Sequence, residues 1–270
     1  MPDPDAAEAK QPLLMLHGLG VGWAQYASVL SFFSKAPALQ QRPIALLIQP
    51  NISMMFFHRQ YLHPPSMRSS AAGMKRMADR HRFNQTGMTV LSHSMGTIAH
   101  AWLLKMHPEL CARSCFVDPV CFCLWEPHVC FQFLYKKVST PIELIMRFFV
   151  GRELGVAITL QRAFNWSENL LFPSSIPDLT DPYKSAFFLA SEDSILSAER
   201  VRKYLKRHGV VQVRRSNKAP GPYEGGMKVH YGKKHGESMI GNGKGFKEIM
   251  RWCMLERDEQ DSDDEDDDER

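Results

Sequence analysis

The chain has 270 residues, of which 44% are hydrophobic, and a formal net charge of +4. This length and apolar content are enough for one sizeable domain with a buried core, which excludes disordered, collagen-like and disulfide-stapled chains. Ten of the 29 acids lie beyond residue 257, so residues 1–257 carry a net positive charge. The sequence shows no zinc-finger, RNA-recognition or basic-zipper spacing, so we expect no nucleic-acid partner.

Short apolar runs alternate with longer amphipathic segments along the chain, a pattern typical of parallel strands joined by helices. The sequence therefore predicts an α/β fold. Strands are expected at residues 13–16, 44–48, 88–91, 115–117, 186–189 and 227–230, and helices at 66–82, 95–106, 198–207 and 244–256. Gly209 follows the third of these helices, residues 198–207, as its C-cap.

Residues 119–182 interrupt this alternation with aromatic-rich segments and six prolines. We interpret them as a mostly helical insertion. The core domain then consists of residues 1–118 and 183–257. Residues 258–270 carry dense acidic charge and nothing apolar to bury, so they are expected to form a disordered tail.

The six cysteines include no CxxC pair, and the opening residues do not form a signal peptide. We therefore expect reduced thiols that act as packing groups, no metal and no organic cofactor. The apolar stretch 141–160 contains four charged residues and fails as a membrane span. These observations predict a cytoplasmic protein.

Residues 89–97, TVLSHSMGT, place Ser94 between an apolar strand and a helix-forming run, with the small residues Ser92 and Gly96 two positions before and after it. A sharp turn of this kind, the nucleophile elbow, strains the backbone of the serine and needs small neighbours at both positions. Serine replaces the usual first glycine here. We predict Ser94 to be a nucleophile and the Met95 N–H, at the start of a helix, to be one oxyanion donor.

The sequence His17-Gly-Leu-Gly20 follows the first predicted strand directly. A glycine-rich turn at this place can direct a backbone N–H toward a reaction centre, and we predict the Leu19 N–H as the second oxyanion donor. The alternative interpretation is an ordinary strand-to-helix turn.

A serine nucleophile needs a histidine to accept its proton and a carboxylate to orient that histidine. Among eleven histidines we favour His235, which lies in a loop before a glycine, whereas His208 lies on a helix and His230 within a strand. Asp193 follows the end of a predicted strand, where α/β sheets keep functional groups. The order Ser, Asp, His agrees with the order found with this elbow.

Asp118 is the alternative acid, because it also ends a predicted strand. The Asp118-Pro119 pair equally suits a turn that opens the insertion, so Asp193 is preferred. Glu192 is less favoured, since a neighbour on a strand end points the other way.

On these residues the sequence resembles the α/β-hydrolase superfamily from about Leu13 to Glu256, and it is most similar to fungal and algal α/β-hydrolase-like proteins. The similar stretches are the Ser94 elbow, residues 48–53 and residues 117–122. The resemblance implies a parallel sheet, a helical cap formed by the insertion, and a triad of Ser94, Asp193 and His235. Strands equivalent to the first two of the family are not evident before Leu13.

The function expected from this resemblance is hydrolysis of an ester, thioester or lipid acyl bond through an acyl-enzyme, with a small apolar ester or acyl compound as the substrate. Serine as the nucleophile argues against the epoxide-hydrolase and dehalogenase branches. A non-catalytic binding protein, an acyltransferase and peripheral membrane contact through the cap stay open as alternatives. Apolar insertion residues that suit an acyl chain, or that form the insertion's own core, are Trp125, Phe131, Phe133, Met146, Phe148 and Trp166.

Overall fold

The structure is a computed structural model, and it describes residues 10–35, 42–139, 141, 144, 147–213 and 225–255. The predicted acidic tail, residues 258–270, lies outside this part of the chain, as does Met146.

Six parallel strands form one sheet in the order β2-β1-β3-β4-β5-β6. The central strands are buried along their length because they carry nearly continuous apolar runs, such as LLML in β1 and SAFFLA in β5. β2 is half-buried throughout, and among the described residues no strand pairs with its outer side. The strands are β1 (Leu13–Leu16), β2 (Ile44–Leu47), β3 (Met88–His93), β4 (Cys111–Val117), β5 (Ser185–Ala190) and β6 (Gly226–His230).

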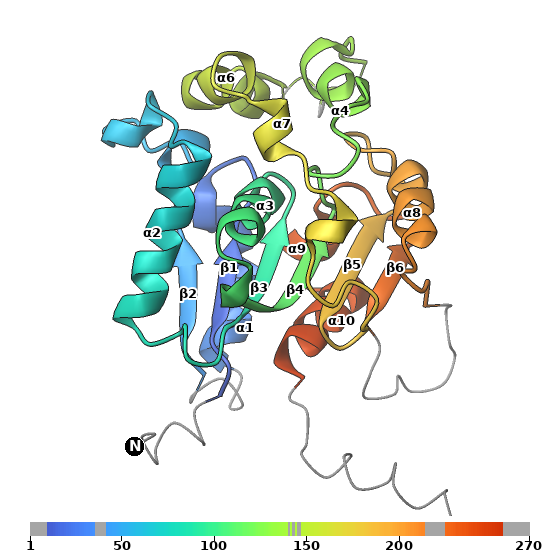
Figure 1. The fold of residues 1–270 in the computed structure, drawn as a ribbon. Helices are drawn as coiled ribbons and strands as arrows, with labels where there is room; N and C mark the ends of the chain where they lie inside the picture. Colours follow the sequence, from blue (N-terminus) through green and yellow to red (C-terminus); the bar gives the residue numbers. More distant parts are fainter. Residues whose placement is uncertain are drawn as a thin grey trace, which may run out of the picture.

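Helices cover both faces of the sheet (Figure 1). Val29 of α1 and Ile249 of α10 belong to the buried cluster on one face, which α9 also joins. Met74 of α2, Leu103 of α3 and Leu205 of α8 belong to the cluster on the other face. The helices are α1 (Ala27–Lys35), α2 (Met67–Arg80), α3 (Gly96–Met106), α8 (Ala198–Arg207), α9 (Glu237–Ile240) and α10 (Lys244–Met254).

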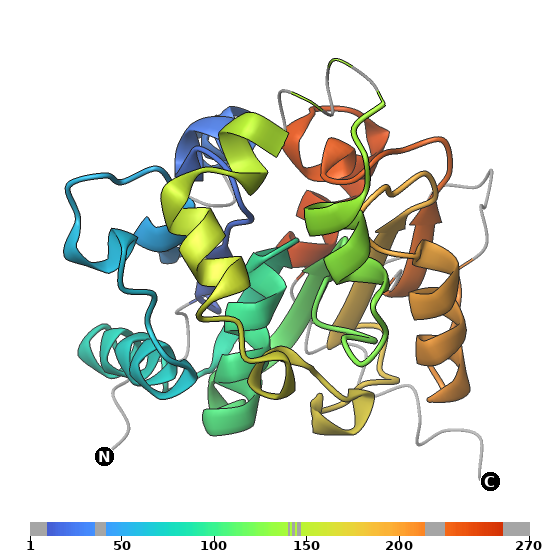
Figure 2. The same ribbon diagram turned by 90° about the horizontal axis from the view of Figure 1, so that it is seen from above.

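The helices of residues 119–182 lie over the carboxyl ends of the strands, and the last residues of this segment descend beside the sheet to the start of β5 (Figures 1 and 2). Glu153 caps α6, the longest of the helices described within this segment, by accepting hydrogen bonds from the N–H groups of Gly155 and Val156 at 3.1 and 2.9 Å. The helical elements are α4 (His128–Cys130), π-helical turns at Phe131–Tyr135 and Arg147–Gly151, α6 (Leu154–Gln161), α7 (Trp166–Asn169) and a 3₁₀ turn at Pro173–Ser175. Other 3₁₀ turns lie at Gly22–Tyr26, Pro50–Ile52, Arg59–Tyr61 and Pro108–Leu110.

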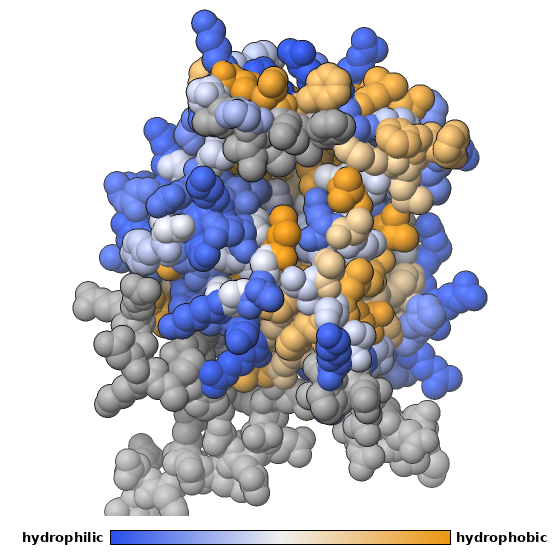
Figure 3. All heavy atoms as spheres, turned by 180° about the vertical axis from the view of Figure 1, so that it is seen from behind, coloured by the Kyte–Doolittle hydropathy of each residue, from blue (hydrophilic) through white to orange (hydrophobic). Residues whose placement is uncertain are grey.

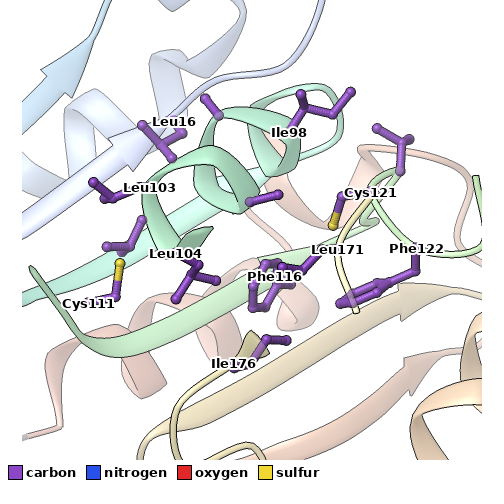
Figure 4. Packing of buried hydrophobic residues seen from close by; sticks show 14 of the residues in the cluster. Leu16, Ile98, Leu103, Leu104, Cys111, Phe116, Cys121, Phe122, Leu171 and Ile176 are labelled. Atoms are coloured by element: carbon purple, nitrogen blue, oxygen red, sulfur yellow. The ribbon is translucent and has the colours of Figure 1, made fainter. Parts of the chain in front are cut away.

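The end of this segment is anchored in the core beside α3 and β4 (Figure 4). Leu171 and Ile176 pack there in the same cluster as Phe116. The Leu171 N–H donates to the Cys121 carbonyl oxygen at 2.9 Å, which holds the two ends of the segment together. The base of the insertion is therefore fixed to the sheet.

The six predicted strands and four predicted helices are all present, and the α/β fold class is confirmed. β4 begins four residues earlier than predicted. Gly209 follows α8 with a positive φ of 89°, as a residue just beyond a helix end can. Helices α1 and α9 were not predicted. α1 buries only Val29 fully and is rich in serine and phenylalanine, which have weak helix propensity, and α9 is a single turn.

All six cysteines are free thiols, and five are buried, as expected of packing groups. None of the described helices is long and apolar enough to cross a membrane.

Candidate active site

Ser94 lies in the turn between β3 and α3 with a positive φ of 51°, a conformation that non-glycine residues rarely adopt. The Ser94 N–H donates to the Val117 carbonyl oxygen at 3.0 Å, and the Thr97 hydroxyl donates to the Ser94 carbonyl oxygen at 2.6 Å. A Cβ at Gly96 would lie 2.2 Å from the Leu16 carbonyl oxygen. The small residue is therefore required because α3 begins directly against β1.

Ser92, two positions before Ser94, is part of a buried hydrogen-bonded network. Its Oγ donates to the Cys115 carbonyl oxygen at 3.2 Å and lies 2.9 Å from Nδ1 of His100. Nε2 of His100 lies 3.1 Å from the Ser114 hydroxyl. Burial lowers the pKa of His100 to about 3, so the ring is neutral and links β3, α3 and β4 through both nitrogens. Serine at position 92 thus ties the elbow to its neighbours.

His235 lies between Ser94 and Asp193. Its Nε2 is 2.7 Å from the Ser94 Oγ, and its Nδ1 is 2.6 Å from Oδ2 of Asp193. The other oxygen of Asp193 accepts hydrogen bonds from the N–H groups of Ile195 and Leu196 at 2.7 and 3.0 Å. Because its Oδ1 is held by these two N–H groups, Asp193 directs Oδ2 toward the histidine. The Nδ1–H of His235 then donates to Asp193, and its Nε2 accepts from the Ser94 hydroxyl.

The charge on His235 is set by opposing effects. Burial acts to lower the pKa of His235, but the hydrogen bond and negative charge of Asp193, with a smaller contribution from the charge of Asp118, outweigh it. The pKa of His235 is therefore raised above its ordinary value. The protonated form of His235 is therefore stabilised, which suits this ring to act as a general base.

Asp118 is almost completely buried beneath the same loop and does not contact the His235 nitrogens through a hydrogen bond. Its Oδ1 accepts from the Ala190 N–H at 2.8 Å, and its Oδ2 accepts from the Gly236 N–H at 2.7 Å. Burial raises the pKa of Asp118 to about 6, against the opposing effects of the His235 charge and of these two N–H donors. The structure thus places the alternative acid as a support for the backbone beside His235.

The two predicted oxyanion donors lie at the cavity that Ser94 also lines. Leu19 and Met95 both border this cavity, and within the described part of the chain their N–H groups donate no hydrogen bond. A Cβ at Gly18 would lie 3.0 Å from the Ser94 Cβ, so the glycine turn passes directly beside the serine. Two N–H groups without an acceptor among the described residues thus belong to residues that line the cavity with Ser94.

Tyr26 and His93, neither of which was predicted from the sequence, hold the glycine turn. The Gly18 N–H donates to the Tyr26 hydroxyl oxygen at 2.7 Å, and that hydroxyl lies 2.6 Å from Nδ1 of His93. Burial, followed by the charges of His235 and His17, lowers the pKa of His93 well below its ordinary value. The neutral His93 ring therefore accepts a hydrogen bond from the Tyr26 hydroxyl, and this contact fixes the turn relative to the elbow.

A cavity of about 470 Å³ opens above Ser94. Its walls are mainly apolar and come from the insertion, with Trp125, Leu160 and Phe164 among them. Its carboxylate, Glu126, is paired with Arg200 of α8. The cavity can therefore take an uncharged, apolar group next to the serine hydroxyl.

Asp118, Asp193 and His235 are also the residues to test as metal ligands, since one atom of each lies within 4.8 Å of the others. The oxygens of Asp118 accept from backbone N–H groups, and Nδ1 of His235 is hydrogen-bonded to Asp193. We interpret the cluster as hydrogen-bonded rather than metal-binding.

The structure brings together Ser94, His235 and Asp193, with Leu19 and Met95 beside the serine, while their catalytic roles stay predictions. His208 lies exposed at the end of α8, and Glu192 is exposed. Of the insertion residues expected at an acyl chain, Trp125 and Trp166 line the cavity, and the side chain of Phe133 lies outside the described part.

The chain matches no protein-family model and no curated protein. Solved structures match it over most of its length. An α/β-hydrolase enzyme from a sediment metagenome of the Mar Chica lagoon, Morocco, is 14% identical with a TM-score of 0.54, and the match covers 89% of this chain and 88% of that one. The 2-hydroxy-6-oxo-6-phenylhexa-2,4-dienoate hydrolase of Rhodococcus sp. strain RHA1 is 12% identical with a TM-score of 0.53, and the match covers 91% of each chain. A pyrethroid hydrolase is 13% identical with a TM-score of 0.51, covering 90% of this chain and 96% of that one. At these identities the likeness concerns the fold.

Proposed function

Since the protein has the α/β-hydrolase fold, we propose that it is a serine hydrolase that cleaves an ester, thioester or lipid acyl bond. The observation that carries the proposal is the hydrogen-bonded series from Asp193 through His235 to Ser94, with contacts of 2.6 and 2.7 Å. A histidine held in this way can take the proton of a serine hydroxyl, which is otherwise a weak nucleophile at neutral pH.

In the proposed reaction, Nε2 of His235 accepts the Ser94 proton while Oγ attacks the acyl carbonyl carbon. The tetrahedral intermediate collapses, the bond to the leaving alcohol or thiol breaks, and His235 gives its proton to that group. Water then loses a proton to His235 and attacks the acyl-enzyme, and the proton returns to Ser94 as the carboxylic acid departs. Asp193 stays ionised throughout and stabilises the charged imidazole.

The N–H groups of Leu19 and Met95 are proposed to bind the oxyanion of both tetrahedral intermediates. Support comes from their position at the cavity and from the absence of other acceptors for them among the described residues. Donors fixed before the reaction need no reorganisation when the charge develops.

The substrate is proposed to be apolar in its acyl part. The cavity walls carry Leu124, Val129, Leu160 and Phe164, and the Glu126 carboxylate is neutralised by Arg200. An acyl chain would bury its methylene groups against these side chains, which is favourable without a specific polar contact.

A fluorophosphonate probe, which reacts with activated serines, tests the proposal on the full chain at neutral pH. We expect stoichiometric labelling of the wild type, none of Ser94→Ala, and a labelling rate about a thousandfold lower for His235→Ala. His208→Ala is the matched control, since His208 is exposed and remote from Ser94, and it should label as the wild type does. Labelled wild type would then be assayed with esters of increasing acyl length.

Two results would overturn the proposal. Full labelling of Ser94→Ala would place the reactive group elsewhere. Absence of labelling in wild type that unfolds cooperatively would instead favour a non-catalytic binding protein with the same fold.

A further inference from the structure

A loop beside the insertion exposes several large apolar side chains. Residues 54–62 connect the turn after β2 to the segment that leads into α2, and in this loop Phe57 is fully exposed. Leu154, at the start of α6, is also exposed. We call Met55, Phe56, Phe57, Leu62 and Leu154 the rim surface. Figure 3 shows apolar atoms gathered at the upper edge of the molecule, on the side where this loop and α6 lie.

The loop is bound firmly to α6. The Tyr61 hydroxyl donates to the Glu153 carboxylate that caps this helix. The Asn51 side-chain amide, just before the loop, donates to the Thr159 hydroxyl at 3.0 Å. A Cβ at Gly155 would lie 2.6 Å from the Tyr61 ring, so helix and loop are in close contact. The exposed phenylalanines are therefore presented from a well-packed base.

The charges around the rim surface have one sign. No acid occurs in the sequence between Asn51 and Ala78, whereas this stretch contains Arg59 and Arg68. On the α6 side, Arg152 and Arg162 are exposed, and the acid between them, Glu153, is buried against Tyr61. Within the described residues these four arginines form no ion pair. An apolar surface bordered by unpaired bases matches the interface of an anionic bilayer.

We propose that the rim surface docks this protein onto a bilayer that contains anionic lipids, with Phe56 and Phe57 inserted at the level of the headgroups and Arg59 and Arg152 facing lipid phosphates. The phenylalanines protrude instead of lining a groove, which suits a fluid partner better than a folded one. A symmetric contact between two copies would bring the arginines of one copy against those of the other.

The same helix connects the rim surface to the cavity. Leu154 points outward from the first turn of α6, whereas Leu160 in its last turn lines the cavity above Ser94. Docking would therefore bring the helix that forms one wall of the cavity close to lipid. The proposal does not depend on the catalytic role of Ser94, because lipid binding is measured without turnover.

Co-sedimentation of the full chain with vesicles tests the proposal. We expect the wild type to bind vesicles of phosphatidylcholine with roughly one third phosphatidylserine, to bind pure phosphatidylcholine about tenfold more weakly, and to lose most of that difference in high salt. Phe57→Ser alone should lower the partition coefficient severalfold, and Phe56→Ser with Phe57→Ser about tenfold. Val211→Ser is the matched control, an apolar residue that is 67% exposed beside the start of β6, at the edge of the sheet opposite β2.

A second variant tests the contribution of charge and replaces both Arg59 and Arg152 with glutamate. This pair should abolish the preference for anionic vesicles, whereas Arg207→Glu, at the exposed end of α8, should not. Thermal unfolding of every variant excludes misfolding as the cause. Failure of the wild type to bind, or binding that Phe57→Ser and the arginine pair leave unchanged, would overturn the proposal. A wild-type dimer in size-exclusion chromatography that Phe57→Ser dissociates would overturn it in favour of a contact between copies.

Discussion

The floor and the roof of the candidate site hold their side chains in different ways. On the floor, at the carboxyl ends of the strands, Ser94 is 7% and Asp118 is 1% exposed, and backbone N–H groups fix the carboxylates. In the roof, residues 119–182, Trp125 and Trp166 line the cavity while remaining 46% and 54% exposed.

This difference separates two tasks. Hydrogen bonds are directional, so the floor sets where the reacting atoms lie, whereas apolar contacts are not, so the roof sets the size and polarity of what enters. Changes to the floor should alter the rate or the stability of the fold. Changes to the roof should alter the choice of substrate.

The largest effect is expected for Asp193→Asn. Asparagine keeps an acceptor for Ile195 and Leu196 but removes the charge that stabilises the imidazolium, and kcat should fall about 10⁴-fold. His235 must be neutral to act, so wild-type activity should be lost as the pH falls through a value above 6.5. Without the Asp193 charge, this loss should move to lower pH. The pH dependence of kcat for a soluble ester measures both effects.

Glu192→Gln is the control for this variant, because Glu192 is the exposed neighbouring acid and its loss should leave kcat unchanged. A decrease of less than tenfold in Asp193→Asn would mean that another acid supports His235.

The next effect concerns stability. Gly96→Ala places a methyl group 2.2 Å from the Leu16 carbonyl oxygen, so α3 and β1 must separate, and the free energy of unfolding should fall by about 3 kcal/mol. Gly73→Ala, within α2, meets only the end of the Arg76 side chain at 3.8 Å and should stabilise the protein by about 0.5–1 kcal/mol. Urea unfolding monitored by circular dichroism compares the two. Equal stability of both variants would contradict the close contact at the elbow.

A smaller effect is expected for Asp118→Asn, which tests a positioning residue. The NH2 group of asparagine would face the backbone N–H of either Ala190 or Gly236, and one of the two hydrogen bonds would be lost. Because these bonds hold the backbone beside His235, kcat should fall about tenfold with little change in KM. The charge of Asp118 contributes to the raised pKa of His235, so the pH profile should also move to lower pH, by less than in Asp193→Asn. A decrease as large as that of Asp193→Asn would identify Asp118 as the acid itself.

The smallest effect on the reaction itself is expected from the roof. Leu160→Trp fills part of the cavity, so kcat/KM for long-chain esters should fall about fivefold relative to acetate esters. Fluorophosphonate labelling should continue at nearly the wild-type rate. If short and long esters lost activity equally, the cavity would not hold the acyl chain.

The sequence predicted the elements and the residues that meet at the strand ends, because buried strands, a small-Ser-small elbow and loop residues after strands leave local patterns. The hydrogen bonds that hold these residues in place could not be predicted. The contact of Asp118 with Gly236 joins positions 118 residues apart, and that of Tyr26 with His93 joins positions 67 apart. Such pairs arise from packing of the whole fold, and no spacing along the chain indicates them.

Serine at position 92 also bears on how relatives of this protein can be found. Its hydroxyl is hydrogen-bonded to the ring of His100, eight residues later, and that ring is hydrogen-bonded in turn to Ser114. A chain that places glycine at the first position has no hydroxyl there for this ring to meet. Search patterns that accept serine at this position, and that require the later histidine with it, would pick out proteins sharing this form of the elbow and would pass over those with the glycine form.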